Sequence, residues 1–347
     1  MIQVSNFRPL KGLKPPFEEL RNRVEHTKKI IVQHPQYEEL LDELKMRFML
    51  SNGSVSPDCL FIYGHTGVGK STVTTEFTEC FPRQLVELSD RKYMKIPVLK
   101  VTVPPKATPR SLASKILKIM GDPLHHRGTE TELTSRVHHY IEACDVKMIV
   151  LDEFQHLIDA DTQHVLSTAS NWVKTFTEEI NIPVVLCGMP ESLRIFETNP
   201  QLDRRFTNKI ELTPFLYRTE AEIVQFRVFL KKIENDLPFY ESSNITDRII
   251  SDKIYYVTNG IPFYVMQLIV EATTSALLDG SDKILETHLN KAFRKIKQSA
   301  RKLIANPFED NKFELSDYLQ LEKEKEDFLK QQTNEEKKKK RISKKKL

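Results

Sequence analysis

Residues 60–72, LFIYGHTGVGKST, are the part of this 347-residue chain that most restricts its fold. Four residues suited to a buried strand run into a glycine-rich turn, and a segment with helical character, STVTTEFTECF, begins directly after Lys70. A buried strand joined by a short turn to a helix is typical of a parallel sheet that helices cover on both faces. We therefore expect an α/β domain.

The strand and helix alternation continues downstream and then stops. Strands are predicted at CLFIY, VLKVTV, MIVLDE, PVVLC and KIEL, with amphipathic helical segments between them. After these strands, Thr219 and Glu222 form a capping box that opens the first of four helical segments. The predicted domains are a helical extension at 1–50, an α/β nucleotide-binding domain at 51–216, an all-helical domain at 217–304 and a disordered, charged tail at 305–347.

The turn after the first strand matches the phosphate-binding pattern G-x-x-x-x-G-K-[ST]. Glycines let backbone N–H groups surround phosphates, a lysine reaches the β- and γ-phosphates, and a serine hydroxyl binds Mg²⁺. The alternative is an ordinary glycine-rich turn, but the strand before it and the helix after it favour a nucleotide site. The sequence predicts ATP and Mg²⁺ as cofactors, with nucleotide contacts from Gly64, His65, Thr66, Gly67, Val68, Gly69, Lys70, Ser71, Thr72 and Asp152 and metal contacts from Ser71 and Asp152.

Two acids end the run MIVLDE, so Asp152 is expected at the carboxyl edge of a buried strand, where open α/β sheets bind ligands. Asp152 is the predicted Mg²⁺ partner, and Glu153 is the predicted catalytic residue that polarises the attacking water. Two acids after a strand can instead cap the next helix. A small-molecule kinase would need a pocket for a phosphate acceptor, which nothing in the sequence marks, so the pair favours ATP hydrolysis.

Arg204 and Arg205 lie just before the last predicted strand, too far along the chain to reach their own phosphate site easily. Either one could enter the site of a neighbouring subunit in a ring or filament and neutralise charge on the γ-phosphate. Both are therefore candidate catalytic residues. The alternative is that they are surface cations near a helix end.

A predicted helix at TPRSLASKILKIM carries basic side chains and no acid on its polar face. Thr108 is its expected cap and Pro109 its first residue. Such a face could follow the phosphate backbone of duplex DNA without reading bases, although a solvated face is the commoner explanation. The candidate DNA contacts are Lys106, Arg110, Lys115 and Lys118, and the lysine-rich segment EEKKKKRISKKKL could add affinity or dock a partner.

Several other classes of protein are disfavoured. The chain has no apolar run of the roughly 20 residues that cross a bilayer and no secretory signal pattern, so we expect a cytoplasmic protein without membrane contacts. Its four widely spaced cysteines indicate neither a disulfide framework nor a zinc site. The net charge of +4 is concentrated at the C-terminus, so any DNA surface on the body must be local.

In their order, these motifs resemble AAA+ ATPases over roughly residues 35–300. The segments IYGHTGVGKST, VLKVTVPPKATPRSLASKIL, MIVLDEFQHLID and IPVVLCGMPESLRIFETNPQLDRRF are similar to transposition regulators of the TniB/TnsC type. The resemblance implies a parallel sheet between helices, a small helical lid and a basic tail. It also implies a bacterial protein that assembles with ATP on duplex DNA, as hexameric or heptameric rings or as filaments. The assembly links a target-selecting protein to a transposase until hydrolysis resets it.

Two positions depart from the general AAA+ pattern. The strand before GMPE ends in Cys187, Gly188 and Met189 where a polar residue is usual, and Phe263 stands where the lid often has an arginine. Both departures predict slow hydrolysis that depends on assembly or on a partner. Two alternatives remain open: a loader or motor of the origin-recognition or ExeA-like type, and a scaffold that binds ATP without hydrolysing it.

Overall fold

The computed structural model describes residues 7–50, 57–89, 92–158, 163–298, 301, 304–325 and 327. Two compact units divide the chain: an α/β unit, Gln33–Thr213, and a helical unit that combines Met1–Val32 with Pro214–Leu347. The extension expected at 1–50 is therefore split. Its first part contributes Ile30 and Val32 to the helical core, whereas its second part packs under the sheet.

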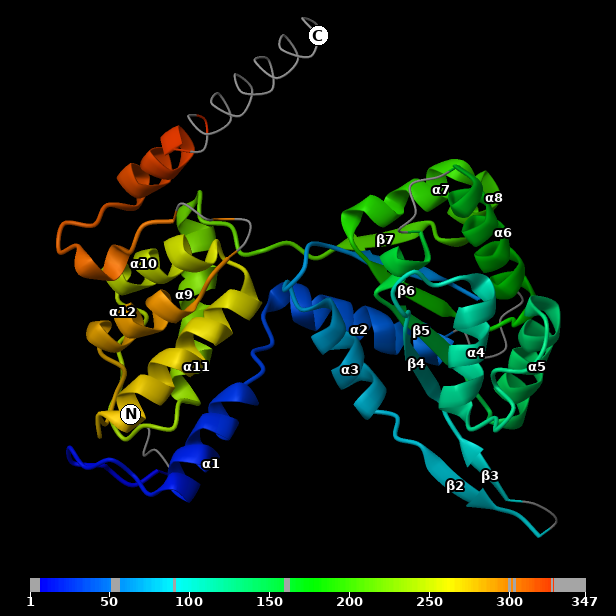
Figure 1. Cartoon of the computed structure of the whole chain (residues 1–347), viewed down its shortest axis with the longest axis horizontal. Coiled ribbons are helices and arrows are strands. Elements are labelled where there is room, and N and C mark those ends of the chain that lie inside the picture. Colours follow the sequence, from blue (N-terminus) through cyan, green and yellow to red (C-terminus); the bar gives the residue numbers. More distant parts are fainter. Residues whose placement is uncertain are drawn as a thin grey trace, which may run out of the picture. The chain divides into compact units, whose positions relative to one another are not determined.

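A five-stranded parallel sheet forms the centre of the α/β unit, with the order β4-β5-β6-β1-β7 (Figure 1). The strands are β1 (Leu60–Tyr63), β4 (Val98–Thr102), β5 (Met148–Asp152), β6 (Val184–Gly188) and β7 (Asn208–Glu211). All five predicted strands are thus confirmed. The register pairs Thr102 with Asp152 and Tyr63 with Gly188, so the carboxyl ends of neighbouring strands meet along one edge of the sheet.

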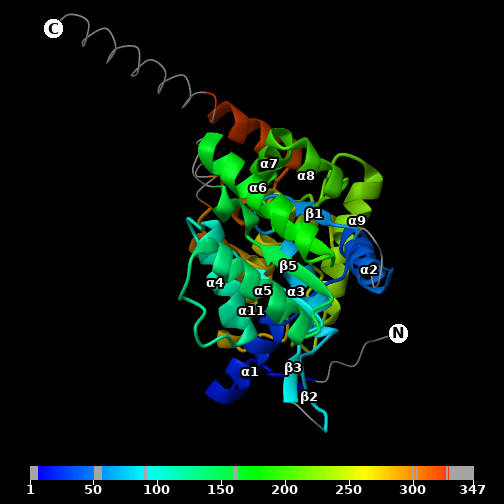
Figure 2. The same ribbon diagram turned by 90° about the vertical axis from the view of Figure 1, so that its right-hand side faces the viewer.

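Helices cover both faces of this sheet because its strands are apolar on both sides. The helices α2 (Pro35–Leu50) and α3 (Lys70–Glu79) pack on the face that carries Leu60 and Val150. Five others pack on the opposite face, which carries Phe61 and Ile149 (Figures 1 and 2): α4 (Pro109–Met120), α5 (Glu130–Ala143), α6 (Gln163–Glu179), α7 (Arg194–Thr198) and α8 (Pro200–Arg205). Short 3₁₀ turns, η1 (Phe154–Leu157) and η2 (Pro190–Leu193), follow β5 and β6.

A β-hairpin that the sequence did not predict lies between α3 and β4. Its strands, β2 (Gln84–Glu87) and β3 (Lys92–Lys95), pair antiparallel and project from the α/β unit (Figures 1 and 2). Leu85 and Met94 face each other across the hairpin and are 60% and 42% exposed. The strands are short and interrupted by charged residues, so neither a buried run nor a clean alternation marks them.

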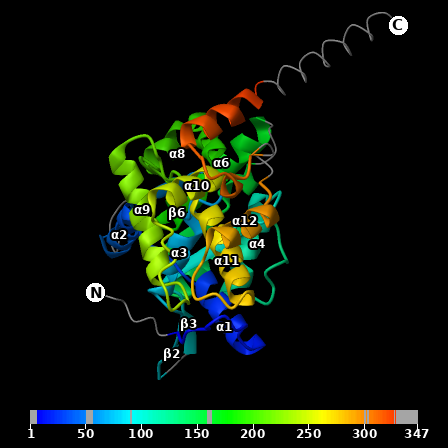
Figure 3. The same ribbon diagram turned by 90° about the vertical axis from the view of Figure 1, so that its left-hand side faces the viewer.

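The helical unit contains the four helices expected after the sheet: α9 (Glu220–Asn235), α10 (Arg248–Thr258), α11 (Pro262–Leu278) and α12 (Glu286–Lys295) (Figure 3). Thr219 caps α9 as predicted, since its hydroxyl accepts from the Glu222 amide while the Glu222 carboxylate accepts from the Thr219 amide. Among the described residues no single helix could cross a membrane; α10 and α11 pass that test only as a pair bent by 117°.

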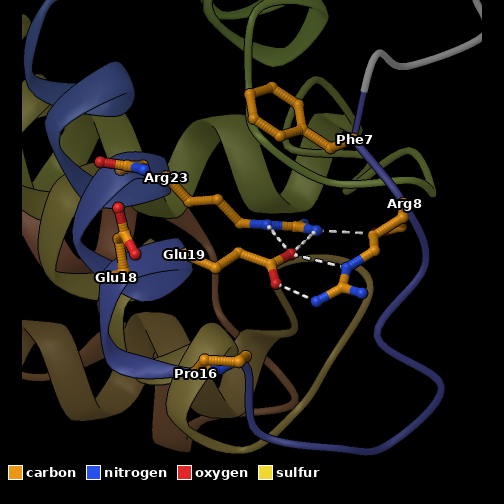
Figure 4. Close-up of a pocket in the computed structure, with 7 residues that line it drawn as sticks. Phe7, Arg8, Pro16, Glu18, Glu19 and Arg23 are labelled. Atoms are coloured by element: carbon orange, nitrogen blue, oxygen red, sulfur yellow. Dashed lines mark hydrogen bonds and ion pairs between the residues drawn. The ribbon is translucent and has the colours of Figure 1, made fainter.

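The N-terminal segment is fastened to the helical unit by a buried arginine. Arg23 in α1 (Phe17–Lys28) donates to the carbonyl oxygens of Pro238, at 2.8 Å, and Arg8, at 2.7 Å, and to the Glu19 carboxylate. Figure 4 shows Arg8 and Arg23 converging on Glu19. The Arg8 guanidinium lowers the pKa of Glu19 to about 2. Both arginines are therefore occupied by contacts that hold the N-terminal segment, and the pocket that they line together with Phe7 and Pro16 is part of this attachment.

The chain also stays packed beyond residue 305, where the sequence predicted a tail. Phe308, in the 3₁₀ turn η3 (Pro307–Glu309), and Phe313 are buried in the helical core. Arg301 forms an ion pair of 2.6 Å with Glu322, and both side chains are largely buried. Arg294 also pairs with Glu309, and Lys253 donates to the Asp310 carbonyl at 2.8 Å. Buried aromatic rings and charged contacts thus hold a segment whose average composition is polar. The lysine-rich end of the predicted tail lies outside the described residues.

Candidate nucleotide site

The glycine-rich loop between β1 and α3 folds back onto the ends of β6 and β7. The Gly64 amide donates to the Gly188 carbonyl at 3.3 Å, and a Cβ on Gly64 would lie 2.2 Å from the Leu212 carbonyl oxygen. Gly67 and Gly69 have φ values of 87° and 107°, which disfavour residues with a side chain. The loop thus has the curvature that lets backbone N–H groups face an anion at the start of α3.

Lys70, the first residue of α3, is buried and points back into the loop. Its ammonium donates to the carbonyl oxygens of Gly64, at 2.6 Å, and His65, at 3.0 Å. Burial lowers the pKa of Lys70, and the charges of Glu153 and Asp152 oppose that shift. A buried cation whose contacts are its own loop carbonyls is positioned to exchange them for phosphate oxygens.

The remaining loop residues divide into supports and exposed groups. Val68 is buried against the core under the sheet and anchors the turn. His65, Thr66, Ser71 and Thr72 are exposed at the surface of the loop and the first turn of α3. The Thr66 hydroxyl lies 3.4 Å from the Met189 sulfur, which connects the loop to the segment after β6. All loop residues predicted to contact nucleotide therefore lie around one turn.

Asp152 and Glu153 sit at the carboxyl edge of the sheet, as predicted. Asp152 is buried at the end of β5, and its Oδ1 accepts from the Glu153 amide at 2.9 Å. Glu153 is half-buried and has φ 57° and ψ 39°, a left-handed conformation that is uncommon for a non-glycine residue. Strain of this kind clusters at functional sites. Because of this conformation the backbone leaves the direction of β5 at Glu153, directly after Asp152.

Gln155 holds the Glu153 side chain, a contact that the sequence did not reveal. Its Nε2 donates to Glu153 Oε2, while its Oε1 accepts from the Met189 amide at 3.2 Å. The amide group therefore spans the ends of β5 and β6. Cys187, the last side chain of β6 on this face, is fully buried, and burial raises its pKa. At the end of β6, where a polar side chain is usual, the polar group comes instead from Gln155 in η1, the turn that follows the neighbouring strand β5.

Lys100 is a second feature that the sequence analysis missed. It lies in the middle of β4, and its ammonium donates to the Ser71 carbonyl at 2.9 Å and to the Thr75 hydroxyl at 2.6 Å. The same nitrogen is 3.5 Å from Asp152 Oδ2. The sequence does contain a sign of this contact, because Lys100 interrupts the apolar run VLKVTV of a predicted buried strand. A buried lysine is rarely found without partners for its charge.

The donor chemistry of this edge fits ATP and Mg²⁺. The loop offers backbone N–H groups and a buried ammonium to phosphates, and Ser71 and Asp152 offer the hydroxyl and carboxylate oxygens that Mg²⁺ prefers. Within the described ranges, no group of three or more His, Cys, Asp or Glu could hold a metal by protein ligands alone. Mg²⁺ commonly takes only one or two protein carboxylates and completes its shell with phosphates and water.

The two candidate arginines have different surroundings. Arg205 is half-buried near the end of α8 and donates to the Thr177 carbonyl at 2.5 Å, while its Nε is buried without an acceptor. Arg204 is exposed, and no hydrogen bond or ion pair of its guanidinium occurs within the part of the chain that the structure describes. Arg205 is thus engaged in its own fold, whereas Arg204 is available to another molecule.

The predicted DNA contacts lie on and beside α4, which Thr108 caps by accepting from the Ser111 amide. Lys106 and Lys118 are exposed, and Lys115 is half-buried. Arg110 is exposed but donates to the carbonyl oxygens of Gly128 and His126, so it fastens the loop between α4 and α5. That loop brings exposed His126 and Arg127 to the same end of α4, two basic residues absent from the predicted set.

Comparison with known proteins gives the family. The sequence pattern of the family described as bacterial TniB protein matches residues 23–216, more than half of the chain. The chain belongs to the TniB family. This confirms the resemblance seen in the sequence motifs. The matched region contains the glycine-rich loop, both acids and both candidate arginines.

The TniB-family chain is also similar to a curated replication protein. It is 24% identical over 237 residues to ORC1-type DNA replication protein 2 of Sulfurisphaera tokodaii, covering 65% of this chain and 53% of that protein. The chain therefore spans about half the length of this curated relative.

Solved structures share the fold at low sequence identity. Aeropyrum pernix ORC2, in ADPNP-ADP complexes, matches with a TM-score of 0.57 and 16% identity over 80% of this chain and 72% of that one. Pyrobaculum aerophilum Cdc6p matches with a TM-score of 0.56 and 17% identity, over 77% of this chain and 69% of that one. Aeropyrum pernix ORC1, in complex with DNA, matches with a TM-score of 0.55 and 17% identity, over 83% of this chain and 69% of that one. These likenesses confirm the predicted AAA+ fold.

Proposed function

We propose that this TniB-family chain is an ATPase that binds duplex DNA and regulates transposition. The observation that carries the ATPase part is the meeting of the glycine-rich loop, buried Lys70, Asp152 and strained Glu153 at one edge of the sheet. Bound ATP would supply the phosphoanhydride bond, and Mg²⁺ would neutralise charge on its phosphates. That ORC2 was solved with ADPNP and ADP supports nucleotide binding by this fold.

Each residue has a distinct role in this proposal. Lys70 would leave the loop carbonyls and bind phosphate oxygens, and Ser71 and Asp152 would hold the Mg²⁺ ion. Glu153, oriented by Gln155, would polarise the attacking water. Arg204 is our candidate for the arginine that a neighbouring subunit supplies, because Arg205 is held by the Thr177 carbonyl.

The proposed product of the ATP cycle is an assembly on DNA. Subunits would form a ring or filament in which each supplies Arg204 to the next, a head-to-tail arrangement. Lys106, Lys115 and Lys118 would contact the phosphate backbone, with Arg110 holding the loop that adds His126 and Arg127. The assembly would link a target-selecting protein to a transposase, and hydrolysis would reset it. Family membership and the DNA-bound ORC1 structure support this part.

Electron microscopy of the full chain with long duplex DNA tests the proposal. We expect rings or filaments on DNA with ATP or a slowly hydrolysed analogue, and none with ADP. A Lys70→Ala variant, which lacks the phosphate-binding ammonium, should not assemble. Assembly that is independent of nucleotide, or no assembly on DNA, would contradict a nucleotide-controlled DNA switch.

A loader of the origin-recognition type is the second candidate, and the 24% identity to an ORC1-type replication protein favours it. A transposition regulator should bind its transposase in the ATP state, whereas a loader should deposit another protein on DNA and dissociate. The Glu153→Gln variant addresses the remaining alternative of a scaffold that never hydrolyses ATP. We expect this variant to form long-lived assemblies, whereas a scaffold would be unchanged by the substitution.

A further inference from the structure

Lys100 carries a positive charge close to the nucleotide loop. The proposed ATPase mechanism assigns no role to this charge. Its side chain projects from β4 to the face covered by α3, on the same side of the sheet as Asp152. Only 17% of the side chain is exposed. A lysine this buried is expected to have partners, and here they come from the first turns of α3 and from the end of β5.

The distances show which partner holds the ammonium. The bonds to the Ser71 carbonyl and the Thr75 hydroxyl are 2.9 and 2.6 Å, whereas Asp152 Oδ2 is 3.5 Å away. The short bonds tie Lys100 to α3, and α3 is fixed by its packing. The charge therefore stays beside Asp152 whether or not the carboxylate turns toward another cation.

We propose that Lys100 is a built-in cation of the nucleotide site that competes with Mg²⁺ for Asp152. The proposal rests on the proposed function, in which Ser71 and Asp152 hold the metal. Lys100 lies next to both residues, and it neutralises Asp152 when no metal is bound. The positive charge of Lys100 also repels a divalent ion that binds to Asp152. The free Mg²⁺ concentration needed for tight nucleotide binding is consequently set, in part, by a residue that does not contact the nucleotide.

The Lys100→Gln variant tests this competition in the full chain. Glutamine removes the charge and carries an N–H donor on a side chain that is one bond shorter, so the stability of the variant is measured as well as its Mg²⁺ dependence. Fluorescence of a labelled ADP analogue is followed while MgCl₂ is raised from a chelator-buffered start. We expect the Mg²⁺ midpoint of tight binding to fall on the order of tenfold, since removing a unit charge about 5 Å from a divalent ion has that effect even in water.

Two further variants separate charge from structure. Lys100→Arg keeps the charge and should keep the midpoint near that of the unchanged chain. Lys95→Gln removes an equal charge at the opposite end of the neighbouring strands, where Lys95 pairs with Asp145 at 2.8 Å, and should not move the midpoint. Chelation of Mg²⁺ by free nucleotide is the same for all variants. Thermal unfolding without nucleotide verifies that each is folded.

The outcomes are distinguishable. A lower midpoint for Lys100→Gln alone supports the competition. An unchanged or higher midpoint in a folded Lys100→Gln chain that still binds nucleotide overturns it and leaves the proposed function standing. If the unchanged chain binds no nucleotide at any Mg²⁺ concentration, the proposed function itself is wrong.

Discussion

Replacing Arg204 and Arg205 separately should give opposite kinds of defect. Arg205 donates to the Thr177 carbonyl, so Arg205→Ala removes a charge-assisted hydrogen bond inside the α/β unit. Arg204 is exposed, so Arg204→Ala should leave the fold intact and remove only a contact to another subunit. The two residues are adjacent and chemically identical, and each is therefore the matched control of the other.

The size of each effect follows from these surroundings. A hydrogen bond from a charged donor contributes about 1.5–3 kcal/mol, but Arg205→Ala also removes a buried Nε that has no acceptor, so we expect a net loss of about 1–2 kcal/mol. In a unit of this size that lowers the melting temperature by roughly 2–8 °C. Arg204→Ala should change stability by less than about 0.5 kcal/mol. Loss of a trans arginine should reduce ATP hydrolysis by about 10³-fold or more.

Mixing inactive variants tests whether Arg204 acts between subunits. Arg204→Ala lacks the arginine but keeps Glu153, and Glu153→Gln lacks the carboxylate but keeps Arg204. In a random equal mixture about one quarter of head-to-tail contacts combine an intact Glu153 with an intact Arg204, so hydrolysis should return to about that fraction of the unchanged rate. Phosphate release is measured on DNA with each variant alone and with the mixture.

The reasoning would be refuted by a mixture that is no more active than its two components. If Arg205→Ala rather than Arg204→Ala showed full stability and recovery on mixing, the assignment of the two arginines would be reversed. If neither substitution affected hydrolysis by the assembled chain, no arginine of this pair would act on the nucleotide.

Three further results are expected. Gln155→Leu should release the Glu153 carboxylate and lower kcat for ATP about 10²-fold with unchanged nucleotide affinity; an equal loss of affinity would show general damage to the site. Gly64→Ala should cost about 1–3 kcal/mol in denaturant unfolding, because the new Cβ collides with the Leu212 carbonyl, and an unchanged midpoint would contradict that crowding. Burial lowers the pKa of His288 in the folded chain, so the unfolded chain binds the proton more readily. The free energy of unfolding should therefore be highest above about pH 6.5 and should decrease as the pH falls below that value. His288→Gln should remove that part of the decline, as thermal unfolding at pH 7 and pH 5 would show.

The sequence predicted the parts of the fold that depend on local pattern. Five apolar runs became the five strands of the sheet, and the caps at Thr108 and Thr219 begin α4 and α9. The phosphate loop was recognisable because glycine, lysine and serine must occupy fixed positions along one turn. Each of these features is encoded within about a dozen consecutive residues, which is the range that pattern analysis covers.

Features that depend on distant partners were missed. The polar segment after residue 305 looked unable to pack, yet Phe308 and Phe313 bury two rings against α-helices that precede it by many residues. The exposed β2–β3 hairpin has no buried face, so the hydrophobic pattern that reveals other strands is lacking. In both cases tertiary contacts or backbone pairing, rather than local composition, decide the structure.

In the candidate site, too, a contact between residues on different elements was missed. This contact changes the meaning of the unusual residues at the end of β6. By strand position, Cys187 and Gly188 leave the site without the usual polar side chain, which predicted slow hydrolysis. In space, Gln155 brings an amide to that place from η1, the turn after β5, and holds it between Glu153 and the Met189 N–H. The polar contact is therefore relocated rather than missing. Because Gln155 contacts both strand ends, a movement of the segment after β6 would be transmitted directly to Glu153, and an assembly contact there would be able to control hydrolysis.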